Sequence, residues 1–477
     1  EIAQCLVGSE MCIRDRLLKD FIDEIFEFRR NIREEKIFND ISQETLSRIE
    51  EMEIPETGRP VCDVYKEMTE DVFSNVVRVQ HPRSFACVPG PASVFSWMGE
   101  VMTSAYNPHA SCSSNAPAAD LIEKKLIRWM CDLAGYPKNS GGLFVSGGSM
   151  ANLTALTAAR DAKLRPQERR DAVAYISGQT HSSLAKALHI IGFDRSQIQK
   201  VCVDGQYRMD TDDLIRQIER DIAQGRKPFL VIATAGTTNT GSIDPLRDIA
   251  SICGRYDMWM HVDGAFGASA LISDRYRKLL RGIELSDSLS WDAHKWMMQT
   301  YGCSVALVRD ISSLTNSFSA HPEYLKDAAG GEDSVEFWDL GPELTRPARS
   351  LKLWTSLQAM GTEAFQNAID HGCAMAELAQ KTAACLPGFQ IVSSASLGIV
   401  NFRYCPEGIE DWQADEINRQ IARSVTAGGY AQVFTTELDG KKVLRMCTIN
   451  PETTEEDIAS TIKLIGFTAD KLTEKTA

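Results

Sequence analysis

Two short segments of the chain carry side chains with complementary chemistry. Lys295 lies within DAHKW (292–296), and Asp263 lies within HVDGA (261–265). A lysine amine can capture an aldehyde as a Schiff base, and a carboxylate can keep a pyridine nitrogen protonated so that the ring accepts electrons. Together the two side chains indicate chemistry on pyridoxal 5'-phosphate.

Each of these side chains alone has an ordinary structural explanation. A lysine beside a histidine is usually solvated, and Asp263 could cap a following helix. The surroundings favour a buried site instead. The apolar run 259–262 is typical of a buried parallel strand, and α/β proteins bind ligands at the carboxyl ends of such strands. Lys295 stands between His294 and Trp296, whose large rings make a poor solvated surface.

A third segment has the composition of an anion site. Gly147, Gly148 and Ser149 follow an apolar run and precede a helical pattern over 152–160. Glycines let the backbone approach an anion, and a serine hydroxyl and first-turn N–H groups donate hydrogen bonds where the helix dipole is positive. A tight turn is the alternative, but the flanking patterns favour a phosphate cradle. It is not a Walker loop, because no Gly-Lys-Ser/Thr follows.

Reactive side chains follow or end four predicted strands. The strands are 172–176, 229–234, 259–263 and 288–291, and the side chains are those of His181, Thr237, Asp263 and Lys295. Because parallel strands share a carboxyl edge, we expect these side chains to form one site. The segment around Thr237 also fits a helix N-cap cluster. Alternating strand and helix patterns over 121–308 predict an α/β fold with a doubly wound, mainly parallel sheet.

The segments DAHKW and HVDGA resemble those of the group II pyridoxal-phosphate-dependent decarboxylases, specifically the aromatic-L-amino-acid decarboxylases. The similar segments occur in the same order as in the family, from about Pro55 to Pro451. The chain resembles in particular the tryptophan decarboxylase type of gut Firmicutes. It implies a fold-type I pyridoxal-phosphate transferase fold. The expected parts are a seven-stranded, mainly parallel sheet, an N-terminal helical layer and a small α+β C-terminal domain. The resemblance also implies a homodimer with active sites at the interface.

The resemblance assigns roles to individual residues. It implies that His181 stacks over the pyridine and that Thr237 lies near the ring or the substrate carboxylate. Segment 312–331 lacks apolar periodicity and is expected to be a mobile loop; by resemblance its Tyr324 protonates the carbon from which carbon dioxide has left, although a tyrosine there is more often an anchor. The expected catalytic residues are Lys295, Tyr324, Asp263 and His181. The expected cofactor contacts are Gly147, Gly148, Ser149, His181, Thr237, Asp263, Ala265, Asp292, His294 and Lys295.

The substrate side chain is expected to meet a different group of residues. By resemblance, Val88, Pro89 and Gly90 form a wall, Trp338 lies near the side chain, and His109 reaches across the dimer. A simple crossover and a structural histidine are the ordinary alternatives. Whether Arg346 or Arg349 reaches the site or pairs with acidic neighbours is left open. Because no basic cluster occurs in these segments, we expect an aromatic substrate, tryptophan first and then phenylalanine or tyrosine.

Composition limits the possible partners. The 477 residues include 51 Lys and Arg against 65 Asp and Glu, for a net charge of −14, which disfavours nucleic acid and anionic membranes. The 13 cysteines lack a repeated Cys-x-x-Cys, and no apolar stretch approaches the roughly 18 residues of a spanning helix. We expect a cytoplasmic protein with reduced thiols, a small-molecule substrate and no metal ligands.

The chain divides into four predicted parts. Residues 1–16 show neither helical nor strand periodicity and are expected to lie outside the native fold. An N-terminal helical segment over 17–95, with helical patterns at 17–53 and 61–79, is expected to interlock with the second subunit. The large cofactor-binding domain is expected over 96–345 and the small C-terminal domain over 346–477. No catalytic signal rises above background in the last part.

Two rival functions remain open from the sequence. One is a different fold-type I enzyme, such as an aminotransferase or a glutamate decarboxylase. The other is a cofactor-binding homologue without catalytic activity. Carbon dioxide and an amine as products distinguish the first prediction from transfer of the amino group to a keto acid.

Overall fold

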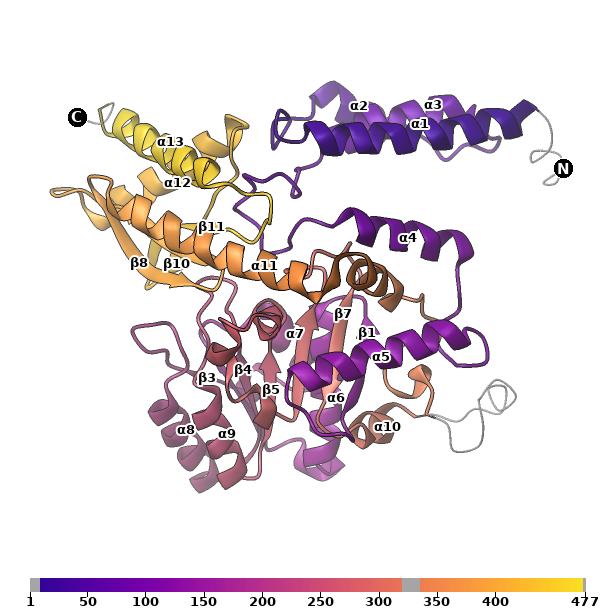
Figure 1. The fold of residues 1–477 in the computed structure, drawn as a ribbon. Coiled ribbons are helices and arrows are strands. Elements are labelled where there is room, and N and C mark those ends of the chain that lie inside the picture. Colours follow the sequence, from indigo (N-terminus) through magenta and orange to yellow (C-terminus); the bar gives the residue numbers. More distant parts are fainter. Residues whose placement is uncertain (1–8, 320–334, 475–477) are drawn as a thin grey trace.

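A seven-stranded sheet forms the centre of the large domain (Figure 1). The protein is described here from a computed structural model that covers residues 9–319 and 335–474. The strand order is β1-β7-β6-β5-β4-β2-β3, and only β7 runs antiparallel to its neighbours. The strands are β1 (Gly141–Val145), β2 (Ala172–Ser177), β3 (Ile198–Val201), β4 (Lys227–Thr234), β5 (Trp259–Asp263), β6 (Ser288–Asp292) and β7 (Ser304–Val308). The predicted mainly parallel sheet is confirmed.

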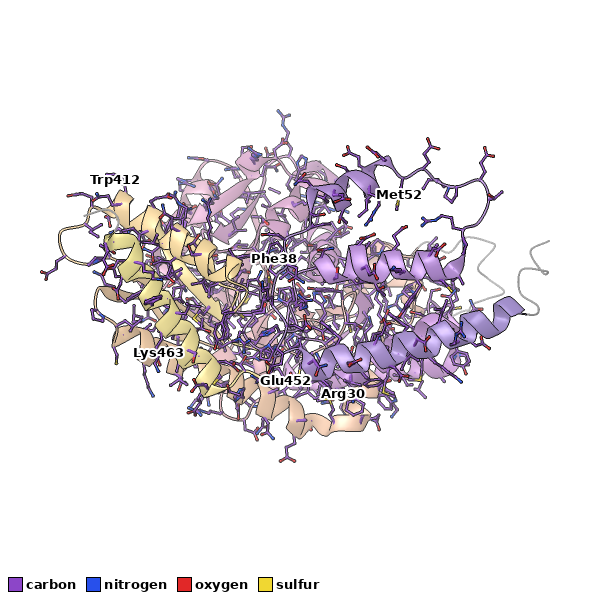
Figure 2. The ribbon with its side chains drawn as sticks, turned by 90° about the horizontal axis from the view of Figure 1, so that it is seen from above. Arg30, Phe38, Met52, Trp412, Glu452 and Lys463 are labelled. Carbon is purple, nitrogen blue, oxygen red and sulfur yellow. The ribbon has the colours of Figure 1, made fainter. Side chains whose placement is uncertain are left out.

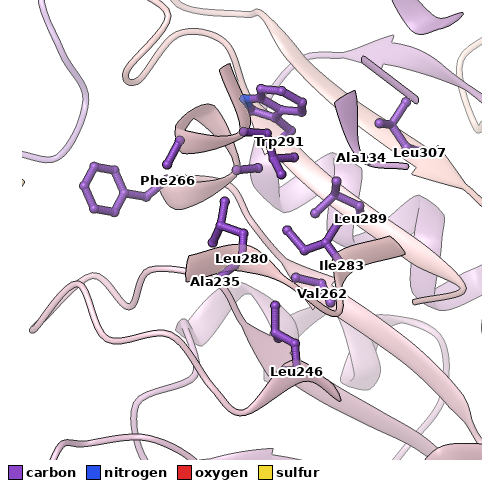
Figure 3. Close-up of a cluster of buried hydrophobic side chains, with 14 of the residues drawn as sticks. Ala134, Ala235, Leu246, Val262, Phe266, Leu280, Ile283, Leu289, Trp291 and Leu307 are labelled. Atoms are coloured by element: carbon purple, nitrogen blue, oxygen red, sulfur yellow. The ribbon is translucent and has the colours of Figure 1, made fainter. Parts of the chain in front are cut away.

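Helices cover both faces of this sheet, because apolar side chains point alternately to the two sides of each strand. In β4, Val231 and Ala233 pack toward one set of helices, while Leu230 and Ile232 pack toward the other. The first set is α5 (Pro117–Leu133), α8 (Thr211–Ala223) and α9 (Leu246–Arg255). The second is α6 (Gly148–Lys163), α7 (Ser182–Ile190) and, against β1 and β7, α10 (Ser312–Phe318). Figure 3 shows part of the first core, including Val262, Leu289 and Leu246.

The N-terminal segment forms a helical layer above α4 (Val94–Tyr106) (Figures 1 and 2). Its helices are α1 (Ser9–Asn31), α2 (Gln43–Glu51) and α3 (Val61–Glu67), followed by a π-turn and a 3-10 turn that end at Asn75. Residues 9–16 are therefore helical, contrary to the expected lack of regular structure. The predicted continuous helix over 17–53 is also wrong, because Ile32 and Ile37 are buried and the Ile37 N–H donates to the Gly429 carbonyl.

Large apolar side chains on this layer remain exposed. They form stripes on successive helices and include Leu18, Ile22, Val64, Val72, Met98 and Val101. The contacts that join the layer to the body include an edge-on contact of Phe26 with the Trp97 ring at 5.9 Å and an ion pair of Arg33 with Asp457 at 3.0 Å. Figure 2 shows Arg30 near Glu452, where α1 approaches the small domain.

The C-terminal domain combines an antiparallel sheet with helices, as predicted. The sheet order is β10-β11-β9-β8. Its elements are β8 (Phe389–Ser396), β9 (Ile399–Tyr404), α12 (Asp411–Ala427), β10 (Phe434–Leu438), β11 (Lys441–Cys447) and α13 (Glu455–Glu474). The long helix α11 (Ser350–Ala384) leads into this domain from the large one and is interrupted at Gly361, whose φ of 75° lies in the left-handed region that favours glycine.

Two segments whose composition favours a loop are partly helical. In the polar segment 102–118, helix α4 continues to Tyr106. Residues 312–318 form α10, with Leu314 fully buried against β1 and β7. A single buried leucine anchors α10, which is why periodicity did not reveal it. Within residues 9–319 and 335–474, no helix combines the length and apolarity that crossing a membrane requires.

Candidate active site

A cavity of about 480 Å³ lies at the carboxyl edge of the large sheet. It is bounded by the turn after β1, the turn after β2, the ends of β5 and β6, and strands of the small domain. His181, Asp263 and Lys295 all line it. The structure thus brings these three side chains from separate strand ends to one cavity.

Asp263 ends β5 and is buried, with 5% of its surface exposed. One carboxylate oxygen, Oδ1, accepts hydrogen bonds from the Ala265 N–H at 3.1 Å and the Ser290 hydroxyl at 3.3 Å. Gly264 allows the chain to turn here, because a Cβ at that position would lie 2.7 Å from Leu289 Cδ1. The carboxylate is thus held at a fixed orientation, with Ala265 beside it as a small part of the wall.

Lys295 follows β6 in a tight turn in which its own N–H donates to the Asp292 carbonyl. The lysine side chain is only 17% exposed, and its Nζ lies 3.1 Å from Asp292 Oδ2. The predicted poorly hydrated setting is confirmed. Asp292 is itself 3% exposed at its side chain, so the ammonium and the carboxylate form a pair shielded from solvent.

His294 lines the same wall and is neutral. Its Nδ1 donates to the Cys303 carbonyl at 3.1 Å, and its Nε2 lies 3.7 Å from Asp292 Oδ2. Burial lowers the pKa of His294 most, the Lys295 charge lowers it further, and Asp292 offsets part of this change. The ring therefore adds shape and a hydrogen-bonding nitrogen to the wall without adding a charge.

The turn over 146–149 has the features of the predicted phosphate cradle. Helix α6 begins at Gly148, so the N–H groups of Gly148 and Ser149 have no partner within the helix and lie at its positive end. Gly147, Gly148 and Ser149 line the cavity. A Cβ on Gly148 would lie 2.7 Å from Asp292 Oδ2, so glycine keeps this corner open.

The donor and acceptor set fits pyridoxal phosphate. The cavity offers an amine on Lys295, a fixed carboxylate on Asp263 and free N–H groups at the start of α6. In addition, Asp292 Oδ1 is buried and has no hydrogen-bond partner within the described residues. A bound group with a proton to donate would satisfy this oxygen, since a buried acceptor without a partner is costly.

Thr237 is not where it was predicted. Its side chain is fully buried, and its hydroxyl pairs with the Thr240 hydroxyl at 2.7 Å. Within the described residues, the cavity is lined by Thr238 and Gly236 instead. Gly236 has a φ of 91°, and the Thr237 N–H bonds back to the Ser242 carbonyl, so the turn sends the Thr237 side chain into the interior.

The predicted substrate residues separate into two groups. Val88 and Pro89 line the cavity, and a Cβ on Gly90 would touch the Lys295 carbonyl oxygen at 2.7 Å. His109 and Trp338 lie elsewhere in this chain and are joined through Ser111, which bonds to the ring of the first and to the backbone of the second. Tyr324 lies outside the described residues.

The two arginines left open by the sequence are both paired with acids. Arg346 is fully buried and donates to Glu123 at 2.6 Å and to the Ala110 and Phe144 carbonyls. Arg349 forms two hydrogen bonds to Glu343, at 2.7 and 2.9 Å. Neither side chain is part of the cavity wall described here.

The small domain contributes an arginine that sequence reasoning missed. Arg445 of β11 lines the cavity and donates to the Thr238 carbonyl at 3.0 Å and to the Ala86 carbonyl. Its Nε is buried without a partner among the described residues. Phe434 of β10 lies in the same wall. The sequence signal was one basic residue in an apolar strand, which also fits a strand residue facing solvent.

Comparisons with known proteins agree with this geometry. Residues 44–405 match the conserved domain of pyridoxal-dependent decarboxylases. The chain is 37% identical to an aromatic-L-amino-acid decarboxylase of Bacillus atrophaeus over 94% of both chains, and 30% identical to a phenylacetaldehyde synthase of Arabidopsis thaliana over 95% of both. A solved structure of Oryza sativa TDC with PLP and tryptamine superposes with a TM-score of 0.91 at 27% identity, covering 98% of this chain and 99% of that one.

These matches span nearly the whole chain, and they cover the sheet, the cradle and the lysine turn together. They favour a carboxy-lyase over the aminotransferase alternative, and pyridoxal phosphate is the cofactor that the cavity fits. The chain belongs to the pyridoxal-dependent decarboxylase family.

Proposed function

We propose that this protein decarboxylates aromatic L-amino acids, tryptophan ahead of phenylalanine and tyrosine, to tryptamine, phenethylamine and tyramine. One observation carries the proposal: Lys295, Asp263 and the start of α6 face one cavity whose wall includes Val88 and Phe434. The relative from Bacillus atrophaeus and the structure with tryptamine support an aromatic side chain. The 30% identical phenylacetaldehyde synthase makes an aldehyde the alternative product.

Different residues of the chain have different roles in the proposed reaction. Pyridoxal phosphate, when bound, supplies a sink for the electrons of the bond to the departing carboxylate. Lys295 presents its amine from a shielded turn, and Asp263 presents a carboxylate to the same cavity. The first turn of α6 and Ser149 would hold the phosphate group. By resemblance, Tyr324 returns the proton to the substrate carbon.

Arg445 gives the cavity a cation besides Lys295. Every amino acid carries a carboxylate, and a guanidinium binds carboxylates well. This single charge does not make a basic cluster for an acidic side chain, so the preference for an aromatic ring rests on Val88, Pro89 and Phe434.

A homodimer is part of the proposal. The exposed apolar stripes on α1, α3 and α4 would be covered by a second copy of the chain. The same arrangement would bring His109 to the partner's cavity. We further propose that the protein works in the cytoplasm, because the described cysteine side chains are free thiols.

The test is incubation of the cofactor-loaded protein with a panel of L-amino acids, including tryptophan, phenylalanine, tyrosine, glutamate and 2,4-diaminobutyrate. Mass spectrometry of the products is expected to show the aromatic amines and an equal amount of carbon dioxide. Turnover of glutamate alone, or a keto acid as product, would overturn the proposal.

The control is Lys295→Ala, combined with borohydride reduction and peptide mapping of the wild type. The reduced pyridoxyl group is expected on Lys295, and the variant is expected to lose more than about 10³-fold of its activity, since a tethered amine acts at a very high effective concentration. A label on another lysine would contradict the assigned site.

A further inference from the structure

A continuous chain of buried hydrogen bonds runs from the interior of the sheet to the cavity. Trp259 Nε1 contacts Ser288 Oγ at 2.8 Å, and Ser288 Oγ contacts His261 Nδ1 at 2.9 Å. His261 Nε2 contacts Asn152 Oδ1 at 3.1 Å. Asn152 Nδ2 then contacts Ser183 Oγ at 3.1 Å, and Ser183 Oγ contacts His181 Nδ1 at 2.8 Å.

At the cavity end of this chain, the direction of hydrogen-bond donation is fixed. The Ser183 backbone N–H donates to His181 Nδ1 at 3.3 Å, so this nitrogen carries no proton. The Ser183 hydroxyl must therefore also donate to it, and it is free to do so because Asn152 Nδ2 supplies the proton that the hydroxyl oxygen accepts. The one N–H of a neutral His181 ring is then on Nε2.

The interior end has the same direction, because Asn152 Oδ1 can only accept a hydrogen bond from His261 Nε2. An indole N–H can only donate, so Trp259 donates to Ser288. Burial lowers the pKa of His261 to about 3, which keeps its ring neutral. With the Ser288 hydroxyl donating to His261 Nδ1, the proton of His261 is on Nε2 and points at Asn152 Oδ1.

The chain connects the elements that build the site. Asn152 is in the second turn of α6, and His261 lies two residues before Asp263 on the same face of β5. Ser288 begins β6, the strand that leads to Lys295. His181 caps α7 and is exposed to the cavity, so its ring is held at Nδ1 by the Ser183 N–H at 3.3 Å and, more closely, by the Ser183 hydroxyl at 2.8 Å.

We propose that Asn152 and His261 are positioning residues that, through Ser183, hold the His181 ring in one orientation with its Nε2–H available to the contents of the cavity. This role deepens the proposed decarboxylase function and rests on it. The catalytic contact belongs to His181. A buried polar network holds its hydrogen-bonded members in one arrangement. This network would therefore hold the His181 ring, which is exposed to the cavity, in one orientation.

The central experiment is Asn152→Asp, which keeps the shape of the side chain and replaces its donor with an acceptor. The Ser183 hydroxyl is then expected to turn toward the new carboxylate and to stop donating to His181. Two-bond ¹H–¹⁵N spectra of apoprotein with ring-labelled histidine report the protonated nitrogen of each ring. His181→Gln and His261→Gln identify the signals of these two rings among the eight histidines of the chain.

For the wild type, both His181 and His261 are expected to carry the proton on Nε2. In Asn152→Asp, the His181 signals are expected to shift or to average between tautomers, and kcat is expected to fall about 10-fold, as for other outer-shell partners, with a smaller change in KM. A wild-type His261 protonated on Nδ1 would overturn the proposal. So would an Asn152→Asp variant with unchanged His181 signals and kcat.

The matched control is Asn418→Asp, which makes the same change in a buried asparagine of the small domain that bonds the Tyr404 backbone. It is expected to leave the His181 signals and kcat per folded protein unchanged; a loss equal to that of Asn152→Asp would overturn the proposal. If Asn152→Asp does not fold, Ser183→Ala tests the same link and is expected to shift the His181 signals and to lower kcat, because only the longer backbone N–H contact at 3.3 Å then remains at Nδ1. Unchanged His181 signals and kcat in Ser183→Ala would contradict the chain.

The two proposals fail in different ways. A wild type that forms no amine from any aromatic amino acid, but has both rings protonated on Nε2, contradicts the decarboxylase proposal and leaves the hydrogen-bond chain intact. Normal amine production with the wrong tautomers contradicts only the positioning role.

Discussion

Lys295 Nζ and Asp292 Oδ2 lie 3.1 Å apart across a single turn at the end of β6. The amine therefore has a negative partner before a cofactor reaches it, while the other oxygen of Asp292 has no partner among the described residues. The pair therefore keeps a carboxylate in the buried site, and a bound ligand can donate a hydrogen bond to its second oxygen.

Asp292→Asn is expected to destabilise the apoprotein by about 3 kcal/mol, because removing one member of a buried pair leaves the other uncompensated. The measurement is chemical unfolding. Asp132→Asn is the control: Asp132 is 66% exposed and pairs with Arg128, and loss of an exposed pair costs about 1 kcal/mol or less. Equal losses in the two variants would contradict a shielded pair at Lys295.

Asp263→Asn is expected to lower kcat by about 10²–10³-fold, as for loss of one preorganised polar group, while Lys295 still takes the borohydride-fixed label. Steady-state kinetics and peptide mapping measure the two effects separately. Asp287→Asn, at the other end of β6, is the control, because Asp287 accepts the Met260 N–H outside the cavity. Full activity of Asp263→Asn would remove this carboxylate from the mechanism.

Tyr324→Phe is expected to lower amine formation by about 10²–10⁴-fold, the usual contribution of a general acid. Product analysis should also include the aldehyde, since an aldehyde synthase is among the relatives. Tyr256→Phe, which removes a hydroxyl bonded to Glu219 on the surface, is expected to behave as wild type. An unchanged rate in Tyr324→Phe would show that another group donates the proton to the substrate carbon.

Gly90→Ala is expected to reduce kcat by up to about 10²-fold, because a methyl group at 2.7 Å from the Lys295 carbonyl oxygen must displace the lysine turn, and small misplacements are costly in catalysis. Gly58→Ala is the control, since nothing lies within 4 Å of its added Cβ. The measurement is kcat together with the unfolding midpoint. A variant with normal kcat would show that the turn tolerates the shift.

The apoprotein is expected to lose stability as pH falls from about 6.5 toward 4. Burial, assisted by the Arg83 charge, lowers the pKa of His81 to about 4, below its ordinary value of about 6.5. The unfolded chain therefore takes up the proton first, so stability is fully present above pH 6.5 and is lost as pH falls through the folded pKa. His81→Asn keeps an acceptor for the Arg83 N–H and should flatten this dependence in urea unfolding.

If His81→Asn and the wild type lose the same stability between pH 7 and 4.5, another group controls the acid side. His261, whose pKa burial lowers to about 3, has the same sign and is the next candidate.

Sequence reasoning located the site because its side chains follow continuous apolar runs. The runs 259–263 and 288–291 are buried on both faces, so their ends could be recognised without knowledge of their neighbours. The prediction that Thr237 faces the cavity was wrong by one residue. The turn at Gly236, whose φ is positive, directs Thr238 rather than Thr237 to the cavity.

Contacts between distant segments could not be predicted in this way. Ile37 breaks the N-terminal helical pattern by bonding to Gly429, almost at the other end of the chain. Arg445 reaches Ala86 across a sequence separation of 359 residues. Periodicity describes which face of an element is buried, but it does not say which element covers that face.

Arg445 also affects the order in which the domains of the protein unfold. Its guanidinium reaches from β11 to the Thr238 and Ala86 carbonyls, so the C-terminal domain closes a wall that the large domain cannot complete alone. Detachment of that domain opens the cavity while the seven-stranded sheet is still folded. Release of vitamin B6 should therefore precede loss of secondary structure during gradual denaturation.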